Sequence, residues 1–276
     1  MRITKFGHAC VRVQGDGGVV VIDPGVFTDP VALEGADAVL ITHEHPDHVH
    51  PDHLRGTGVP IWTIAAVERL LREQAPDVAE RVTVVRPGDR LEVAGSSVQV
   101  VGEKHAVIHP DYDRFDNSGY VVESGGASVY HPGDALTPPG REVDVLLAPV
   151  SAPWLKVSEA IDFVREVAAP RSLGIHDRVY SDVGLDMVST HMANLLPEGL
   201  VFERREPGQD LSPASSASRT GTNFACDSAS SASGSELATM PHPANSRTPP
   251  SVTMAERRAM PHSPSPEASI QPTGPA

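Results

Sequence analysis

The sequence predicts an α/β protein, a four-layer αββα sandwich followed by a disordered C-terminal tail. Short β-branched runs separated by turn residues dominate the first two thirds of residues 1–209, strand–helix units follow them, and the composition changes sharply near Gln209. Two sheets covered on their outer faces by helices would bury the apolar face of every element. Periodicity alone does not select this architecture over other mixed folds.

The first predicted elements are strands, because each is a short apolar or β-branched run bounded by Gly, Pro or Asp. These strands comprise residues 2–6, 10–13, 19–23, 38–43 and 60–64. The stretch AAVERLLREQ directly after them predicts a helix.

A meander of antiparallel strands is predicted next. Residues 82–85, 90–93 and 97–105 are separated by PGD and AGS turns, and residues 119–123 and 127–131 flank the turn SGG. Hairpins therefore dominate this part of the chain.

Strands and helices alternate at the end of the domain. Residues 144–150 and 171–176 predict strands. Between Ser158 and Ala169 the apolar residues recur at i, i+3, i+4, i+7 and i+8, which is one face of a helix that Pro170 ends. A final helix is predicted from Asp186 to Leu196.

The composition restricts the function classes. The chain has 276 residues with 39% hydrophobic residues, enough for a sizeable core, and a formal net charge of −14. That balance argues against nucleic-acid binding, which usually needs a basic face. With only Cys10 and Cys226, neither in a CxxC pair, a thiolate zinc site or disulfide framework is not expected. The chain begins without the apolar run of a secretion signal and has no membrane-length apolar stretch, so we expect a cytoplasmic protein without membrane contact.

Domain organisation follows from the change in composition near Gln209. Of the 66 residues from Leu211 to Ala276, 24 are Ser or Pro. Such a segment cannot bury enough apolar area to offset its ordering entropy. We therefore expect a hydrolase-type domain over residues 1–209 and a Ser/Pro/Ala-rich disordered tail over residues 210–276.

The strongest chemical signal is the segment THEHPDHVH, from Thr42 to His50. It follows the apolar run AVLI, so His43 stands where a buried strand gives way to a loop. Three imidazoles and a carboxylate in the spacing H-x-H-x-D-H are ligands that zinc, iron and manganese accept. A solvated, His-rich surface loop is the plain alternative, and the position after an apolar strand argues against it.

This segment resembles the H-x-H-x-D-H signature of the metallo-β-lactamase superfamily, and further landmarks recur in order over residues 1–205. VVVIDPG, VVGEKHA, SVYHPGDA and LGIHD resemble the segments that carry the family's remaining site residues. The short inserts and GHACVRV near the start make the chain most similar to the compact UPF0173 and L-ascorbate-6-phosphate-lactonase-like branch.

The resemblance implies a role for each matching residue. The first metal ion is expected on His43, His45 and His105, the second on Asp47, His48 and His176, and Asp134 is expected between them. Two zinc ions are expected, although manganese or iron suits the same ligands. Asp47 is in addition the expected catalytic residue, which orients a metal-bound hydroxide and passes its proton to the leaving group.

Further residues are expected around this centre. Asp23, at a strand end, would steer the loop or a ligand imidazole. His8 and His131 are expected to support the ligands in the same way, although His8 could equally serve only in packing. His109 competes with His105 as a ligand, and His105 is favoured because it directly follows the strand. Trp154 and Lys156, in SAPWLKVS, are expected to shape the substrate pocket.

The resulting functional hypothesis is a metal-dependent hydrolase that uses a metal-bound hydroxide on a small, anionic ester, lactone or amide. Two alternatives remain at this stage: a phosphodiesterase of the same fold, and a metal- or ligand-binding protein that has lost catalysis. The expected partner is a small-molecule substrate, with no nucleic acid and no membrane. Substrate, metal identity and oligomeric state do not follow from the sequence.

Overall fold

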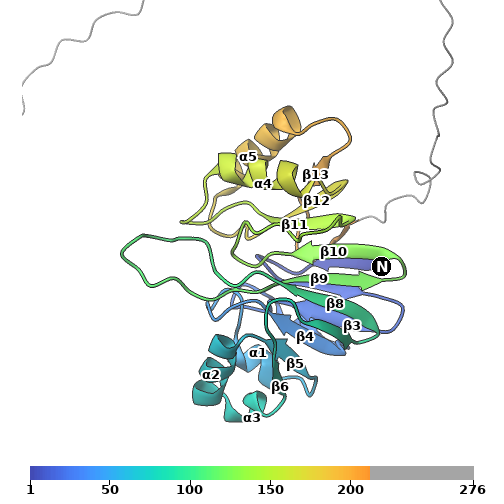
Figure 1. Cartoon of the computed structure of the whole chain (residues 1–276), viewed down its shortest axis with the longest axis vertical. Helices are drawn as coiled ribbons and strands as arrows, with labels where there is room; N and C mark the ends of the chain where they lie inside the picture. The colour runs from blue at the N-terminus through green and yellow to red at the C-terminus, as the bar shows by residue number, and fades with distance from the viewer. Residues whose placement is uncertain (212–276) are drawn as a thin grey trace, which may run out of the picture. The chain divides into compact units, whose positions relative to one another are not determined.

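The computed structural model describes residues 1–211, so of the tail expected over residues 210–276 all but Asp210 and Leu211 lies outside the described residues. Two seven-stranded sheets face each other (Figure 1). In neighbour order, the first sheet contains β14 (Asp210–Leu211), β1 (Arg2–Lys5), β2 (Val11–Gln14), β3 (Val19–Ile22), β4 (Ala38–Ile41), β5 (Ile61–Thr63) and β6 (Val82–Val84). The second contains β13 (Val201–Glu203), β12 (Arg171–Ile175), β11 (Val145–Pro149), β10 (Ala127–His131), β9 (Gly119–Ser124), β8 (Ser96–Val101) and β7 (Arg90–Val93).

Each sheet changes from antiparallel to parallel pairing once. In the first sheet β14, β1, β2 and β3 pair antiparallel, and β3 to β6 pair parallel. In the second sheet β7 to β10 pair antiparallel, and β10 to β13 pair parallel. The expected hairpins are therefore present, but parallel crossovers also occur in the first half of the chain, where the sequence predicted mainly hairpins.

Helices cover the outer face of each sheet. The helical segments are η1 (Pro30–Leu33), α1 (Pro51–Arg55), α2 (Ala65–Gln74), α3 (Pro76–Ala79), α4 (Val157–Val167) and α5 (Asp182–Leu195). Figure 1 shows α1, α2 and α3 beside β4 to β6, and α4 and α5 beside β11 to β13. The predicted four-layer αββα sandwich is thereby confirmed. Among residues 1–211 no helix is long and apolar enough to cross a membrane.

Strand β3 shows why the sheets sit in the middle of the sandwich. Val20 and Ile22 pack in the core between the two sheets, whereas Val21 packs in the core beneath α1 to α3. All four strand residues are buried, which explains an uninterrupted apolar run instead of alternation. A third core lies between the second sheet and α4 and α5, around Tyr130 and Phe163.

Two helix boundaries differ from the prediction by more than one residue. Helix α5 begins at Asp182, not Asp186, because the Ser181 side chain accepts a hydrogen bond from the backbone N–H of Gly184 and caps the helix there. Helix α4 ends at Val167 because Ala168 adopts a left-handed conformation. The short helices α1 and α3 were not predicted as separate elements.

The described chain extends two residues past the boundary expected at Gln209, and these residues pair with β1. Leu211 lies opposite Ile3 and is 3% exposed within the core between the sheets. Asp210 accepts hydrogen bonds from the side chains of Arg2 and Thr4. Strand β14 therefore pairs with the otherwise open edge of β1 and is the edge strand of the first sheet.

We predict that Leu211→Ala lowers the free energy of unfolding by about 2 kcal/mol, because it removes a buried side chain at a sheet edge where neighbours partly relax. Urea unfolding of the full chain measures this. Val201→Ala, at a 51% exposed position in β13, is the matched control and should change the free energy by less than about 0.5 kcal/mol. Equal stability of Leu211→Ala and the unmodified chain would show that β14 contributes nothing to the fold.

Candidate metal centre

The predicted site residues converge at one edge of the sandwich because each follows the carboxyl end of a strand. His43 follows β4, His105 follows β8, Asp134 follows β10 and His176 follows β12. The two sheets are joined at this edge, where the Tyr120 hydroxyl in β9 donates a hydrogen bond to the carbonyl of Ile41 in β4 (2.8 Å). Side chains from both sheets can therefore reach a common point.

Two groups of side chains could each hold a metal ion, since the ligand atoms within each group lie within 4.8 Å of one another. The first group, in which only His45 is not fully buried, is His43, His45, His105 and Asp134. The second group is His8, Asp47, His48 and His176. The structure thus brings together every residue that the resemblance implied as a metal ligand.

Hydrogen bonds on the far side of each ring assign the tautomers in the first group. The Thr42 hydroxyl donates to Asp23 and accepts from His43 Nδ1 (3.0 Å), so the His43 lone pair is on Nε2, 3.0 Å from His45 Nδ1. His105 Nδ1 donates to the carbonyl of Ala106 (2.6 Å), which leaves Nε2 unprotonated. Burial lowers the pKa of His43 and of His45, and neutral rings offer lone pairs to a cation.

The second group follows the same pattern. His48 Nδ1 donates to Asp23 Oδ2 (2.7 Å) and His176 Nδ1 donates to the carbonyl of Ser151 (2.5 Å). The Nε2 atoms of His48, His105 and His176 are all buried without a hydrogen-bond partner. Buried polar nitrogens are rarely left without partners, so three at one place indicate a missing ligand.

Asp134 lies between the two groups. Its Oδ1 is 3.0 Å from His48 Nε2, and its Oδ2 is 3.1 Å from His176 Nε2 and 3.4 Å from His105 Nε2. An imidazole lone pair facing a carboxylate at this distance is repulsive unless a proton or cation lies between them. Burial opposes a charged ring, but Asp134 outweighs it and raises the pKa of His176 to about 9. The donor set of imidazoles and carboxylates therefore fits divalent transition-metal ions.

His8 reaches the second group, and its tautomer lets it support Asp47 by a hydrogen bond. Its Nδ1 accepts the backbone N–H of Arg178 (3.2 Å), so Nε2 carries the proton and donates to Asp47 Oδ2 (3.0 Å). Burial lowers the pKa of His8 to about 4, which keeps the ring neutral. His8 thus holds Asp47 in place.

Asp23 and His131 lie behind the ligands, where the sequence placed them. The Asp23 carboxylate accepts hydrogen bonds from the Thr42 backbone N–H (2.8 Å), the Thr42 hydroxyl (2.7 Å) and His48. His131 donates from Nε2 to the carbonyl of Ala9 (2.9 Å) and accepts the Gly133 N–H at Nδ1 (3.1 Å). His131 thereby orders the turn that carries Asp134.

Backbone strain is concentrated at the site. His8, Asp23 and His176 have φ values of 46°, 52° and 55°, in the left-handed region that non-glycine residues rarely occupy. Strained backbone of this kind persists where surrounding contacts over-determine it, often at functional sites. Here the hydrogen bonds of the three side chains supply those contacts.

Three supporting residues were missed by the sequence reasoning. Thr42 orients His43 and Asp23, and the Ser151 carbonyl accepts from His176. Asn117 accepts the backbone N–H of Asp134 (3.0 Å) and donates to the carbonyl of Pro132 (2.9 Å). Thr42 directly precedes the metal loop and was detectable. Ser151 uses its backbone carbonyl, and the Asn117 side chain binds the backbone of Asp134 and Pro132, so no sequence motif reports either contact.

The two predicted pocket residues differ in position. The indole N–H of Trp154 donates to Asp134 Oδ2 (3.3 Å), and its ring contacts His105 and His176. Lys156 is 81% exposed at its side chain, where it pairs with Glu159 at the start of α4. Within residues 1–211 no contact joins Lys156 to either ligand group. His109 is likewise outside both groups and contacts Tyr112 and Asp111.

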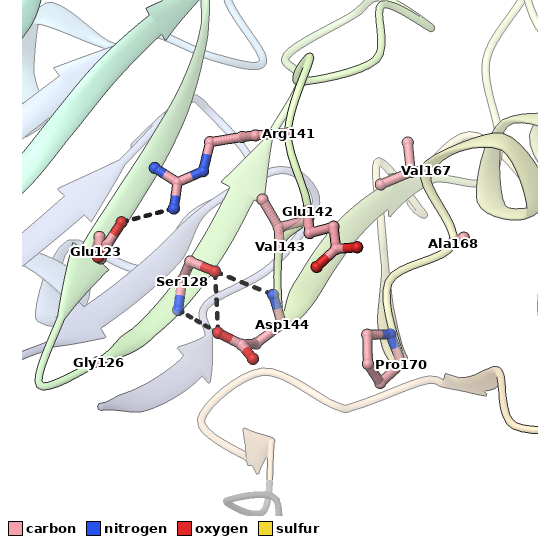
Figure 2. A pocket seen from close by; sticks show the side chains of 10 residues that line it. All are labelled: Glu123, Gly126, Ser128, Arg141, Glu142, Val143, Asp144, Val167, Ala168 and Pro170. Carbon is pink, nitrogen blue, oxygen red and sulfur yellow. Dashed lines mark hydrogen bonds and ion pairs between the residues drawn. The ribbon is translucent and has the colours of Figure 1, made fainter. Parts of the chain in front are cut away.

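A cavity of about 560 Å³ lies at the opposite edge of the second sheet (Figure 2). Its lining includes Ser128, Asp144 and Pro170, at or just before the amino ends of β10, β11 and β12. The metal-ligand groups follow the carboxyl ends of the same strands or their neighbours. This cavity is therefore separate from the metal-ligand groups.

We predict that Asp23→Asn weakens transition-metal binding about 10- to 100-fold, because an amide cannot accept all three hydrogen bonds that orient His48 and Thr42. Competition titration with a chromogenic chelator measures the affinity. Asp37→Asn is the control, since the Asp37 side chain accepts the Val19 backbone N–H and within residues 1–211 no contact joins it to either ligand group. Unchanged affinity in Asp23→Asn would refute the supporting role.

Comparison with known proteins agrees with this geometry. Residues 2–176 match the family described as "Beta-lactamase superfamily domain". Protein Rv0786c of Mycobacterium tuberculosis is 39% identical over 183 residues, which cover 65% of this chain and 85% of that protein. A UPF0173 metal-dependent hydrolase of Methanopyrus kandleri is 29% identical over 205 residues, covering 66% of this chain and 88% of that protein.

Solved structures share the fold. Igni18, a metallo hydrolase from Ignicoccus hospitalis, aligns with a TM-score of 0.58 and 20% identity over 76% of this chain and 97% of that chain. YhfI, a metallo-β-lactamase fold protein from Bacillus subtilis, aligns with a TM-score of 0.59 and 16% identity over 76% and 98% of the two chains. On the family match over residues 2–176, the chain belongs to the metallo-β-lactamase superfamily, and its relatives include proteins of the UPF0173 branch.

Proposed function

We propose that this metal-dependent hydrolase binds two zinc ions and cleaves a small, anionic ester, lactone or amide. The observation that carries the proposal is the convergence of buried, unpartnered Nε2 atoms of His48, His105 and His176 around the Asp134 carboxylate. Under this proposal the first ion is held by His43, His45 and His105, the second by Asp47, His48 and His176, and Asp134 contacts both.

The donor set supports zinc, and it also suits manganese or iron. When bound, two such ions supply a hydroxide nucleophile near neutral pH and polarise the oxygen of the scissile group. The residues of the chain then have to keep a proton off the ligand atom that faces the centre in each ligand side chain. The hydrogen bonds of the four Nδ1 atoms that face away from it serve this purpose.

Asp47 is assigned the catalytic role of orienting the attacking water and relaying its proton to the leaving group. It is the most accessible carboxylate of the two groups, with a side chain 24% exposed, whereas that of Asp134 is 3% exposed. Burial opposes its ionisation, but the His176 ring 3.4 Å away and the hydrogen bond from His8 hold the pKa of Asp47 far below its usual range. Asp47 is therefore ionised and held in one orientation at neutral pH.

An arginine beside the first ligand group supports an anionic substrate. Arg114 is exposed and donates from Nε to the carbonyl of His105 (2.6 Å), which anchors its guanidinium beside a proposed ligand. Arg178 is exposed, and its backbone N–H, not its guanidinium, contacts the site at His8 Nδ1 (3.2 Å). Arg114, and not Lys156, is the cation that we assign to attraction of a substrate anion.

We predict that the purified protein holds two transition-metal ions per chain, counted by elemental analysis. Strong chelators should abolish hydrolysis of a lactone and ester panel, and zinc or manganese should restore it. One ion per chain would contradict the shared role of Asp134. Full activity in a demonstrably metal-free sample would refute the mechanism as a whole.

We predict that Asp47→Ala lowers kcat by about 10²- to 10⁴-fold while the urea unfolding midpoint stays within error, because Asp47 is partly exposed and lies in a loop. Metal content is counted in the same samples, which separates loss of the proton relay from loss of an ion. The control is Asp52→Ala, an exposed carboxylate in α1 that pairs with Arg55. Near-normal turnover by Asp47→Ala would remove Asp47 from the mechanism.

A further inference from the structure

Three aromatic side chains surround the two ligand groups, and we call them the aromatic collar: Phe27, Phe115 and Trp154. Phe27 is 48% exposed and Phe115 is 37% exposed, while Trp154 is half-buried. They come from three different loops, after β3, before β9 and after β11. Apolar rings therefore border the site on several sides and remain in contact with solvent.

Phe27 lies against the second ligand group. Its ring centroid is 5.2 Å from that of His8, in an edge-on arrangement. The loop is held on the metal loop by a hydrogen bond from the Val26 N–H to the Pro46 carbonyl (2.9 Å). At Gly25 a Cβ atom would lie 1.9 Å from the Asp47 carbonyl oxygen, so only glycine permits this close approach.

Phe115 lies against the first ligand group. Its ring centroid is 4.5 Å from that of His45 and 6.3 Å from that of His105. The Phe115 carbonyl accepts the backbone N–H of His105 (3.1 Å), which fixes the base of the loop between β8 and β9. That loop extends beyond the sandwich in Figure 1 and also carries exposed Val107 and Tyr112.

Trp154 lies between the groups. Its ring centroid is 5.6 Å from that of His105 and 6.0 Å from that of His176, and its N–H is bonded to Asp134. The three rings of the collar thus contact the rings of four histidines: His8, His45, His105 and His176. Its positions are set by backbone and side-chain hydrogen bonds, so the apolar surface is present before any substrate binds.

We propose that the aromatic collar binds an apolar acyl or aryl group next to the scissile bond, so that the substrate is amphiphilic and not merely small and anionic. This inference rests on the proposed function, because it locates the scissile bond at the metal ions. Exposed aromatic rings gain little stability from the fold, whereas an apolar group placed against them is removed from water. The other role for these rings is to shield the ligands from water, which gives no dependence on the length of the bound group.

The test uses the full, metal-loaded chain and straight-chain carboxylates from butyrate to octanoate as product analogues. Calorimetry measures their affinity, and the fluorescence of Trp154 reports contact with the collar in a Trp62→Phe background. We expect affinity to rise about two- to fourfold per added methylene, with a negative heat-capacity change. We expect Phe27→Ala and Phe115→Ala each to reduce that increase, while Phe→Leu at either position retains most of it.

Met187→Ala is the matched control, since Met187 is an exposed apolar residue of α5 outside the collar, and it should leave the series unchanged. Affinity independent of chain length, or a chain-length series unaffected by both phenylalanine substitutions, would overturn the inference. Metal content is counted in every sample. Bound metal with a flat series refutes the collar alone, whereas a chain that binds no metal refutes the proposed function.

Discussion

The site depends on the hydrogen bonds that the buried carboxylate of Asp23 accepts. It accepts the backbone N–H and the hydroxyl of Thr42 together with the Nδ1 proton of His48, and the same hydroxyl then accepts from His43. Burying a carboxylate is costly unless such donors surround it, and these bonds to a charged acceptor are stronger than neutral ones. One carboxylate therefore sets the backbone and two ring tautomers of the metal loop, and its left-handed φ of 52° is maintained by the same contacts.

The same arrangement recurs around the centre with different partners. His105 and His176 donate to backbone carbonyls, and His8 donates to Asp47. In each ring the hydrogen bond at one nitrogen decides whether the other nitrogen carries a proton or a lone pair. Because the strands that precede these residues end at one edge of two sheets, all of the free nitrogens face one volume. The aromatic collar lies just outside that volume.

The strands were predictable because apolar runs bounded by Gly, Pro and Asp report burial and turns directly. Short helices such as α1 and α3 were not, since four or five residues carry too little periodicity to be recognised. The start of α5 depended on the Ser181 cap, and the pairing of Asp210 and Leu211 with β1 joins residues some 200 positions apart. Such pairing depends on where the sheet edge lies, which local composition does not report.

The sequence by itself determined the chemical identity of the site: H-x-H-x-D-H and the later segments VVGEKHA, SVYHPGDA and LGIHD contain seven of the eight side chains of the two ligand groups, and GHACVRV near the start contains the eighth, His8. Residue type and order were enough because imidazole and carboxylate are ligands wherever a strand end presents them. Only the tertiary structure decided which nitrogen of each ring is free, and that Trp154 reaches the site while Lys156 does not. These features depend on contacts between segments far apart in the chain, such as Asn117 with Asp134, and on backbone groups that every residue has.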